Sequence, residues 1–294
     1  MTLSKAVTGM PYRMENYSIH DMNYIIKRVQ SEKFRRDAVV IYAGEEGSGK
    51  TTKMCQDAYY VAKQQQLPFS LEENFYFTPT QVIEVINAAK KPEGTPVCYD
   101  EGITGLLARV GNSRDNTDLQ IMFSTCRSKR YPIFICIPRF RELPEWMAID
   151  RSIALYEVYN KRVGDEPEHP GFYKGYDKRN KQTYWWLQKA RRYDQIREKV
   201  TTTQEGMFGG WPFSERSENS PFTYSEYETY KRKCIKAWAK KKKEDRDWKM
   251  RQLLIVKNLR DKGWTETQIA ILMGINVRMV AELVAEVREG GLNV

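Results

Sequence analysis

Short apolar runs alternate with longer amphipathic stretches between about residue 15 and residue 160. The apolar runs predict buried strands, because they are short and rich in β-branched and aromatic residues. The stretches between them are long enough for helices and carry apolar residues at helical spacing. This alternation is typical of a parallel sheet with crossover helices, so we expect an α/β fold. The predicted strands are 38–43 (AVVIYA), 97–100 (VCYD), 132–138 (PIFICIP) and 153–159 (IALYEVY), and the predicted helices are 19–33, 50–65, 79–90 and 115–129.

Beyond residue 160 the composition of the sequence changes twice, and the predicted secondary structure changes with it. Residues 171–188 are aromatic and rich in turn-forming residues, which predicts a hairpin that turns near Lys178–Lys181. Residues 206–222 contain glycine, proline and serine and predict a linker, and the chain that follows has a helical pattern throughout. We therefore expect an α/β domain at 15–205 with a hairpin extension at about 170–190, a linker at 206–222, a long helix at 223–248 and a helical module at 249–291.

The helical module has the pattern of three helices. Gly263 ends a first helix that starts near Trp248, and Thr265 with Gln268 three residues later is the signature of a capping box. Gly274 then allows a sharp turn before a third helix at 277–288. The side chains predicted to face inward are Leu253, Leu254, Val256, Leu259, Ile269, Ala270, Leu272, Val280, Leu283, Val284 and Val287.

A helix, a short glycine-containing turn and a second helix make up the helix-turn-helix arrangement. The module resembles the C-terminal modules of sigma factors and resolvases, which implies that its third helix enters the DNA major groove by its first residues. Those residues are Asn276, Arg278 and Met279. Glu282 and Glu286 make this helix less basic than a typical DNA-reading helix, so docking to a protein stays open as the alternative.

The positive charge of the chain is concentrated before this module. The 294 residues carry a formal net charge of +10, with a sequence pI near 9.2, which suggests either nucleic acid or an anionic membrane surface as a partner. Residues 230–251, the basic stretch, hold eleven Lys or Arg and three acidic residues, a net charge of +8. We expect DNA phosphates to contact Lys240, Lys241, Lys242 and Lys243, although a charged helix can also be only a solvated face.

Other features narrow the class of protein. No run of about 18 apolar residues predicts a membrane span, and Met1–Met14 lacks the apolar core of a secretory signal. The five cysteines are scattered without CxxC pairs and the chain has two histidines, so we expect no structural zinc site. A hydrophobic content of 41% and a charged content of 29% are typical of a globular protein. The missing signal and the scattered cysteines indicate a cytoplasmic location.

Residues 44–51 (GEEGSGKT) match the phosphate-binding pattern GxxxxGK[ST]. The match follows a predicted strand at once and opens a predicted helix, a context that argues against a fortuitous glycine-rich turn. In such a loop the backbone N–H groups surround the β-phosphate, the lysine neutralises the β- and γ-phosphates and the hydroxyl ligates Mg²⁺. We expect ATP to bind here with Mg²⁺ on Thr51, and the expected contact residues are Gly44, Glu45, Glu46, Gly47, Ser48, Gly49, Lys50, Thr51 and Thr52.

Two acidic residues, Asp100 and Glu101, end the apolar run VCYDE. Because neighbouring parallel strands end at the same edge of a sheet, we expect Asp100 beside the phosphate-binding loop, where its carboxylate would hold Mg²⁺. Glu101 is then the candidate catalytic base that orients the attacking water. The alternative is a strand end that carries two solvated acids. Related ATPases place a further strand between these two strands, and residues 70–77 are a candidate for the excursion that allows it.

Seven arginines lie between residues 109 and 151. One of them could reach the γ-phosphate of a neighbouring subunit as an arginine finger, and we name Arg127 first and Arg114 second. A surface or DNA-facing role is the alternative for each. The predicted strand at 132–138 ends in Pro138 and not in Gln, Asn or Thr, so its end predicts no γ-phosphate sensor.

The order of these segments resembles that of the zonular occludens toxin-like and HerA/FtsK-type ATPases of phages, archaeal viruses and plasmids. The resemblance implies an ATPase that drives DNA translocation, packaging, conjugation or virion extrusion, commonly as a homo-oligomeric ring in a prokaryotic or virus-infected cell. Toxin-like members of filamentous phages carry a membrane span after the ATPase domain, and none is predicted here, which favours a DNA motor or packaging protein. The resemblance covers roughly residues 19–200 and rests on GEEGSGKT, ENFYFTPTQVIEVI (73–86), VCYDEG (97–102), TCRSKRYPIFICIP (125–138) and IDRSIALYEVY (149–159).

Three functions stay open on the sequence alone. The first is an ATP-driven motor on DNA. The second is an ATP-regulated DNA-binding regulator or transposition helper that does not translocate, and the third is an adaptor whose helical tail docks to a protein. The first two need the same nucleotide site, so the sequence does not separate them.

Overall fold

The computed structural model describes residues 10–12, 14–33, 35–100, 106, 114–161, 169–213 and 221–288. Glu101 therefore lies outside the described residues. The chain divides into two compact units, Met1–Arg232 and Lys233–Val294. Each unit has a hydrophobic core of its own.

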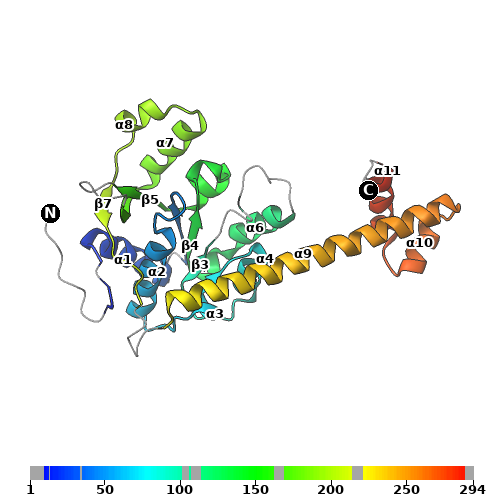
Figure 1. Cartoon of the computed structure of the whole chain (residues 1–294), viewed down its shortest axis with the longest axis horizontal. Coiled ribbons are helices and arrows are strands. Elements are labelled where there is room, and N and C mark those ends of the chain that lie inside the picture. The colour runs from blue at the N-terminus through cyan, green and yellow to red at the C-terminus, as the bar shows by residue number, and fades with distance from the viewer. Residues whose placement is uncertain are drawn as a thin grey trace. The chain divides into compact units, whose positions relative to one another are not determined.

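The first unit is built on a seven-stranded sheet with the strand order β2-β3-β4-β1-β5-β6-β7 (Figure 1). The first five strands of this order are parallel, and β6 and β7 extend the sheet as antiparallel strands. The predicted α/β class with a parallel sheet is confirmed. The strands are β1 (Ala38–Ala43), β2 (Phe75–Tyr76), β3 (Val97–Tyr99), β4 (Pro132–Ile137), β5 (Ala154–Lys161), β6 (His169–Tyr176) and β7 (Gln204–Met207).

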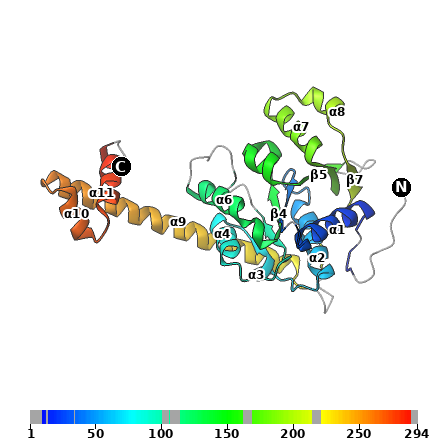
Figure 2. The ribbon, with the colours of Figure 1, turned by 180° about the vertical axis from the view of Figure 1, so that it is seen from behind.

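Helices cover both faces of the sheet (Figures 1 and 2). All six residues of β1 are buried, and because side chains alternate along a strand, Tyr42 meets α2 on one face while Val39 and Ile41 face α4 and α6 on the other. The elements are α1 (Asn16–Gln30), α2 (Lys50–Gln64), α3 (Leu71–Asn74), α4 (Pro79–Ala88), α6 (Arg114–Thr125), η2 (Cys126–Lys129), η3 (Phe140–Glu142), the π-helix η4 (Trp146–Arg151), α7 (Lys178–Lys189), η5 (Tyr193–Gln195) and α8 (Ile196–Lys199).

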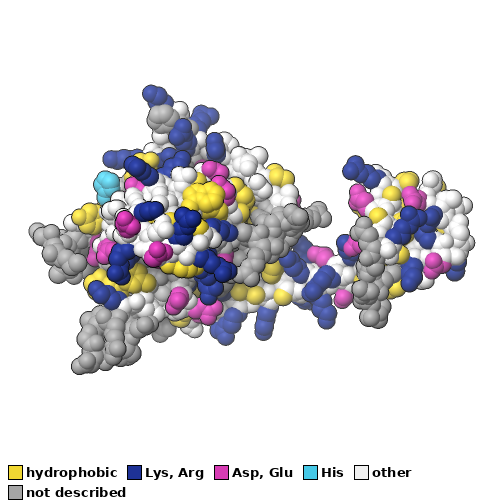
Figure 3. Space-filling view, turned by 90° about the horizontal axis from the view of Figure 1, so that it is seen from above, with side chains coloured by type: hydrophobic (Ala, Val, Ile, Leu, Met, Phe, Trp, Pro, Cys, Tyr) yellow, Lys and Arg dark blue, Asp and Glu magenta, His cyan; other side chains and the backbone are white. Residues whose placement is uncertain are grey.

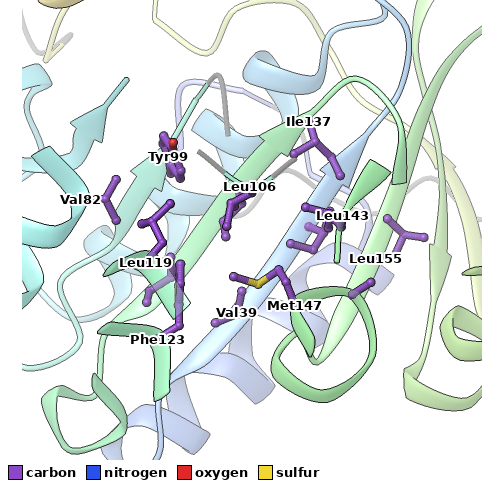
Figure 4. Close-up of a cluster of buried hydrophobic side chains, with 14 of the residues drawn as sticks. Val39, Val82, Tyr99, Leu106, Leu119, Phe123, Ile137, Leu143, Met147 and Leu155 are labelled. Atoms are coloured by element: carbon purple, nitrogen blue, oxygen red, sulfur yellow. The ribbon is translucent and has the colours of Figure 1, made fainter. Parts of the chain in front are cut away.

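The main core lies between the sheet and the second helical layer. In Figure 4, Val39 and Leu155 from the strands pack with Val82 of α4, Leu119 of α6 and Met147 of η4. All five side chains are completely buried. This packing holds the carboxyl ends of β1, β3 and β4 together at one edge of the sheet, where the phosphate-binding loop begins.

The predicted insertion of a further strand between β1 and β3 is confirmed, because β4 pairs with both, and the segment 70–77 supplies the edge strand β2. One prediction about this unit is wrong. The predicted hairpin at 171–188 is the strand β6 followed by the helix α7. Asp177 caps α7 by accepting a hydrogen bond from the Asn180 N–H, and Tyr184, Trp185 and Leu187 bury its inner face, so residues that resemble a turn open a helix.

The predicted linker at 206–222 is also wrong where the structure describes it. Its first residues end β7, and Trp211, Phe213 and Phe222 belong to an aromatic cluster in the first unit. Phe213 and Phe222 are buried, and the first unit extends beyond them to Arg232, so this stretch does not link the two units. The aromatic cluster consists of Tyr59, Phe69, Phe75, Trp211, Phe213, Phe222 and Tyr227.

One long helix, α9 (Tyr224–Asp261), replaces the two helices that were predicted to meet near Trp248. The second unit adds α10 (Glu266–Met273) and α11 (Val277–Arg288). The capping box of Thr265 and Gln268 is confirmed, and Gly274 ends α10 in the left-handed conformation.

The core of the second unit follows the predicted apolar pattern in most positions. Leu254 and Leu272, predicted to face inward, are 44% and 59% exposed. Leu254 lies about 100° around its helix from the buried Leu253, and Leu272 lies about 200° around its helix from the buried Ala270, so a different face packs in each case. The buried residues are Leu253, Val256, Ile269, Ala270, Val280, Leu283 and Val284, with Leu259 and Val287 packed partly buried against them.

In the part of the chain that the structure describes, no single helix has both the length and the apolar composition of a membrane span. The pair α10 and α11 meets both conditions only when it is counted together, and it is bent by 112° at its turn.

Candidate nucleotide-binding site

The phosphate loop, residues 44–51, connects the carboxyl end of β1 to α2. A Cβ atom at Gly44 would lie 2.0 Å from the carbonyl oxygen of Val158 in β5, so a side chain does not fit there. Gly49 caps α2 with a φ of +92°, a conformation that side chains other than glycine rarely adopt. Two of the glycines in the motif are therefore required by the geometry of the loop.

The charged and polar groups of the loop lie close together. The Lys50 ammonium lies 2.6 Å from the carbonyl oxygen of Glu45, which folds it back over the loop. The Ser48 hydroxyl is buried and has no hydrogen-bond partner among the described residues. Glu45, Glu46 and Gly47 are exposed, whereas Gly44, Gly49, Lys50, Thr51 and Thr52 are half-buried, so the predicted contact residues line one continuous loop.

Thr51 and Asp100 meet at the mouth of this loop. The Thr51 hydroxyl oxygen lies 3.2 Å and 3.3 Å from the two carboxylate oxygens of Asp100. Neighbouring ligands of an octahedral Mg²⁺ ion, each about 2.1 Å from the metal, lie about 3 Å apart, and Mg²⁺ prefers such oxygen ligands. These two residues fit a magnesium site, and the predicted proximity of Asp100 to the loop is confirmed.

Two residues of α9 also contact Asp100, and sequence reasoning missed both as parts of the site. The Tyr227 hydroxyl and the Lys231 ammonium lie on the same carboxylate oxygen, Oδ2, with Lys231 at 3.2 Å. Burial, followed by the negative charge of Asp100, raises the pKa of Tyr227 well above its usual value, so its hydroxyl stays a hydrogen-bond donor. Nothing local in the sequence links residues that are 127 and 131 positions apart.

Thiols lie beneath the carboxylate. Burial, followed by the negative charge of Asp100, raises the pKa of the Cys98 and Cys136 thiols well above the usual value. Both stay protonated at neutral pH, and a protonated thiol is a poor nucleophile. These cysteines therefore fill space under the site and do not react.

The arginines fall on different edges of the sheet. Arg127 lies in η2, just before β4, at the edge opposite the phosphate loop. The paired length of β1 and β4 separates it from the loop by roughly 17 Å, so it cannot serve the nucleotide of its own chain. Arg139 follows β4 directly, next to Pro138, whose carbonyl oxygen accepts a hydrogen bond from the Gly44 N–H. The Arg139 side chain is 61% exposed on the loop side of the sheet, and the side chain of Arg114 lies outside the described residues.

The residues predicted to contact DNA lie in the second unit. Lys and Arg side chains gather along α9 (Figure 3). Lys240, Lys241 and Lys243 are exposed, and the ammonium of Lys242 lies 4.2 Å from the centre of the Trp238 ring.

The predicted DNA-reading residues stand at the start of α11. The Asn276 side chain accepts a hydrogen bond from the Arg278 N–H at 2.7 Å, so Asn276 caps the helix. The Arg278 side chain is 88% exposed and lies 3.5 Å from Glu282. Met279 is 48% exposed. All three residues are exposed to solvent. The side-chain oxygen of Asn276 already accepts a hydrogen bond from the backbone of its own helix.

The strand β1, the glycine-rich loop and the helix α2 together have the strand–loop–helix arrangement of a P-loop. No protein-family model matches the sequence, and the comparison with curated proteins gives no match.

Among solved structures, the chain is similar to the N-terminal domain of zonular occludens toxin from Neisseria meningitidis, at 16% identity and a TM-score of 0.34 over 48% of this chain and 84% of that one. A HORMA:CdnC:Trip13 complex from E. coli MS115-1 gives 16% identity and a TM-score of 0.33 over 73% and 77% of the two chains. AMPPCP-bound DnaA from Aquifex aeolicus gives 12% identity and a TM-score of 0.31 over 95% and 90%.

Proposed function

We propose that this protein binds and hydrolyses ATP with Mg²⁺ at the phosphate loop, and that it acts on DNA as a motor of the packaging or translocation type. The observation that carries the nucleotide part is the contact of Thr51 with Asp100 at the mouth of the loop, at 3.2 Å. A bound Mg²⁺ ion, held by these two residues, would neutralise phosphate charge.

The residues of the chain take distinct roles in this proposal. The loop N–H groups and the Lys50 ammonium bind the β- and γ-phosphates, because anions are stabilised at a helix N-terminus that carries a lysine. Glu101 adjoins Asp100 in the sequence and acts as the base that orients water. Arg127, which is too far from the loop of its own chain, would serve only a neighbouring subunit of a ring.

The DNA part of the proposal rests on charge and on helix geometry. The basic stretch carries +8, and each phosphate that it neutralises releases counterions and strengthens binding. In the second unit the 112° bend between α10 and α11 lies within the range of about 90–120° found in helix-turn-helix motifs. Arg278 and Met279 at the start of α11 would then face base edges.

Two alternatives remain, and a specific observation favours the second. A DNA-binding regulator or transposition helper uses the same nucleotide site without translocation. A protein-docking tail is favoured by α10, where Ile271 and Leu272 are 77% and 59% exposed. Adjacent exposed apolar residues of this size are more typical of a protein contact than of a phosphate contact.

Phosphate release measured with and without double-stranded DNA, together with the native mass of the protein, tests the proposal. A motor is expected to hydrolyse ATP faster on DNA and to have the mass of an oligomer. Hydrolysis that DNA leaves unchanged would favour the docking alternative, and no hydrolysis at all would contradict the proposal.

A further inference from the structure

The first two turns of α9 form a wall of the nucleotide site. Tyr227 and Lys231 are four residues apart, so they lie on the same face of the helix, and both contact Oδ2 of Asp100. Tyr227 is 1% exposed and Asp100 is 3% exposed. The side chain of Lys231 is 19% exposed, so it alone of the three has an open path to solvent.

Packing fixes this part of α9 in place. The Tyr227 ring lies 5.5 Å from that of Phe75 and 5.2 Å from that of Trp211, measured between ring centres. Thr223 and Glu226 form reciprocal hydrogen bonds that cap the helix before its first turn. The Tyr227 hydroxyl is therefore held on Asp100 by the fold, whereas the Lys231 side chain lies at the border between Asp100 and solvent.

Lys231 and a divalent cation compete for the Asp100 carboxylate. A buried carboxylate needs a counter-charge, and Lys231 supplies one at 3.2 Å. Mg²⁺ on Thr51 and Asp100 supplies a larger one, and two cations on one carboxylate repel each other. Occupation of the carboxylate by one cation therefore weakens the binding of the other.

Lys231 is also the first cation of the basic stretch, and α9 continues without a break through Lys240–Lys243. A lysine that leaves Asp100 adds a positive charge to the surface proposed to bind DNA phosphates. Conversely, a phosphate that attracts Lys231 removes it from the metal site. By linkage, each effect implies the other with the same coupling free energy.

We propose that Lys231 is a switch that couples metal binding at Asp100 to DNA binding by α9, and that Tyr227 is a positioning residue that orients Asp100. This inference rests on the proposed function, since it needs Mg²⁺ nucleotide at the loop and DNA on the basic stretch. The coupling is positive: DNA lowers the Mg²⁺ concentration needed for nucleotide binding, and Mg²⁺ nucleotide tightens DNA binding.

The test uses the full chain and a fluorescent ATP analogue, with Mg²⁺ titrated at low salt in the presence and absence of double-stranded DNA. The variants are Lys231→Ala, Lys231→Gln, Tyr227→Phe and the matched control Lys233→Ala. Lys233 is exposed on the same helix, and its replacement by Ala removes the same charge from the basic stretch. The glutamine variant keeps the length of the side chain in case the alanine variant folds poorly.

Both Lys231 variants are expected to need at least about fivefold less Mg²⁺ for half-maximal binding than the wild type, and to lose the effect of DNA on that value. The Lys233→Ala control should keep the effect of DNA. Tyr227→Phe should need more Mg²⁺ while its affinity for the nucleotide without Mg²⁺ stays unchanged, which a merely structural role would not produce.

Equal behaviour of the Lys231 and Lys233 variants would overturn the switch and leave the proposed function standing. An unchanged Mg²⁺ requirement in Tyr227→Phe would overturn the positioning role. If the wild-type protein binds no nucleotide at any Mg²⁺ concentration, the proposed function fails, and the switch fails with it.

Discussion

The hydroxyl oxygen of Thr51 lies 3.2 Å from a carboxylate oxygen of Asp100, although the two residues are 49 positions apart in the chain. Thr51 stands in the first turn of α2, which follows β1, and Asp100 follows β3. The strand β4 lies between β1 and β3, and all three run in parallel, so their carboxyl ends share one edge of the sheet. The topology therefore brings together the two oxygen-bearing side chains that we propose as ligands of Mg²⁺.

Replacing Lys50 with Ala is expected to weaken ATP binding about 10- to 100-fold, because charge-assisted hydrogen bonds contribute about 1.5–3 kcal/mol. Lys63→Ala is the matched control, since Lys63 is exposed in the last turn of the same helix. Equilibrium titration with a fluorescent ATP analogue measures both variants. Equal affinities of the wild type and Lys50→Ala for the ATP analogue would contradict nucleotide binding at the phosphate loop.

Substitutions of Asp100 and Glu101 are expected to have different effects, the first on Mg²⁺ ATP binding and the second on ATP hydrolysis. Glu101→Gln keeps size and hydrogen bonding but removes the base, so hydrolysis should fall by roughly 10²-fold while Mg²⁺ ATP binds as in the wild type. Asp100→Asn should instead raise the Mg²⁺ concentration needed for binding. Steady-state phosphate release and nucleotide titration, run on both variants, distinguish the roles. The assignment is reversed if Asp100→Asn stops turnover while Glu101→Gln turns over normally.

The sequence predicts the centre of the site well because its signals are local. A buried strand, a glycine-rich turn and a helix follow each other within residues 38–64, and the acidic end of the next apolar run lies on the same edge by the rules of parallel sheets. The sequence also predicts the ends of α10, since Thr265, Gln268 and Gly274 mark helix ends by their own chemistry. It does not predict that α9 continues without a break through Trp248.

The rest of the site depends on tertiary packing that no local pattern encodes. In the sequence, Tyr227 is a tyrosine in a polar helix with no feature that links it to Asp100. Lys231 is one of the eleven cations of the basic stretch and has no feature that separates it from the others. What brings them to Asp100 is the aromatic cluster, whose members come from four separate segments of the chain. The helix α7 was mistaken for a hairpin because Gly171, Gly175 and Asp177 are turn formers, whereas the helical spacing of Tyr184 and Leu187 decides the structure.

Lys240–Lys243 are expected to contribute more to DNA binding than other exposed cations of the protein. Changing Lys240–Lys243 to glutamine should weaken binding to all DNA sequences alike and reduce the slope of log affinity against log salt by up to about 3–4. The matched control changes four exposed cations of the first unit, Arg191, Arg192, Arg197 and Lys199, to glutamine. Gel-shift titrations at several salt concentrations provide the slopes. Equal losses in the two variants would point to a diffuse charge effect and not to a site on α9.

Lys181 predicts a pH dependence of stability. Its ammonium is buried against the carbonyl oxygens of Ala148 and Ser152, at 2.6 Å each, and closes the π-helix η4. Burial, followed by the like charge of Lys178, lowers the pKa of Lys181 to about 7, below its value of about 10.4 in an unfolded chain. Between these two values the unfolded chain binds more protons than the folded one, so the stability contributed at this site rises with pH.

The measurement for Lys181 is the free energy of unfolding by denaturant at pH 7 and pH 9. The wild type is expected to gain on the order of 1 kcal/mol per pH unit relative to Lys181→Met, which keeps the length of the side chain and does not titrate. A constant difference between the two proteins across this range would show that Lys181 stays charged when it is buried.

A double-mutant cycle on Thr51 and Asp100 tests the central claim most directly. The Mg²⁺-dependent gain in ATP affinity is measured for the wild type, for Thr51→Val, for Asp100→Asn and for the double variant. Because both residues are assigned to one ion, each single change should remove most of this gain, and the double variant should be little worse than either. Effects that add independently, or ATP binding by the wild type that Mg²⁺ leaves unchanged, would contradict a magnesium nucleotide site at this loop.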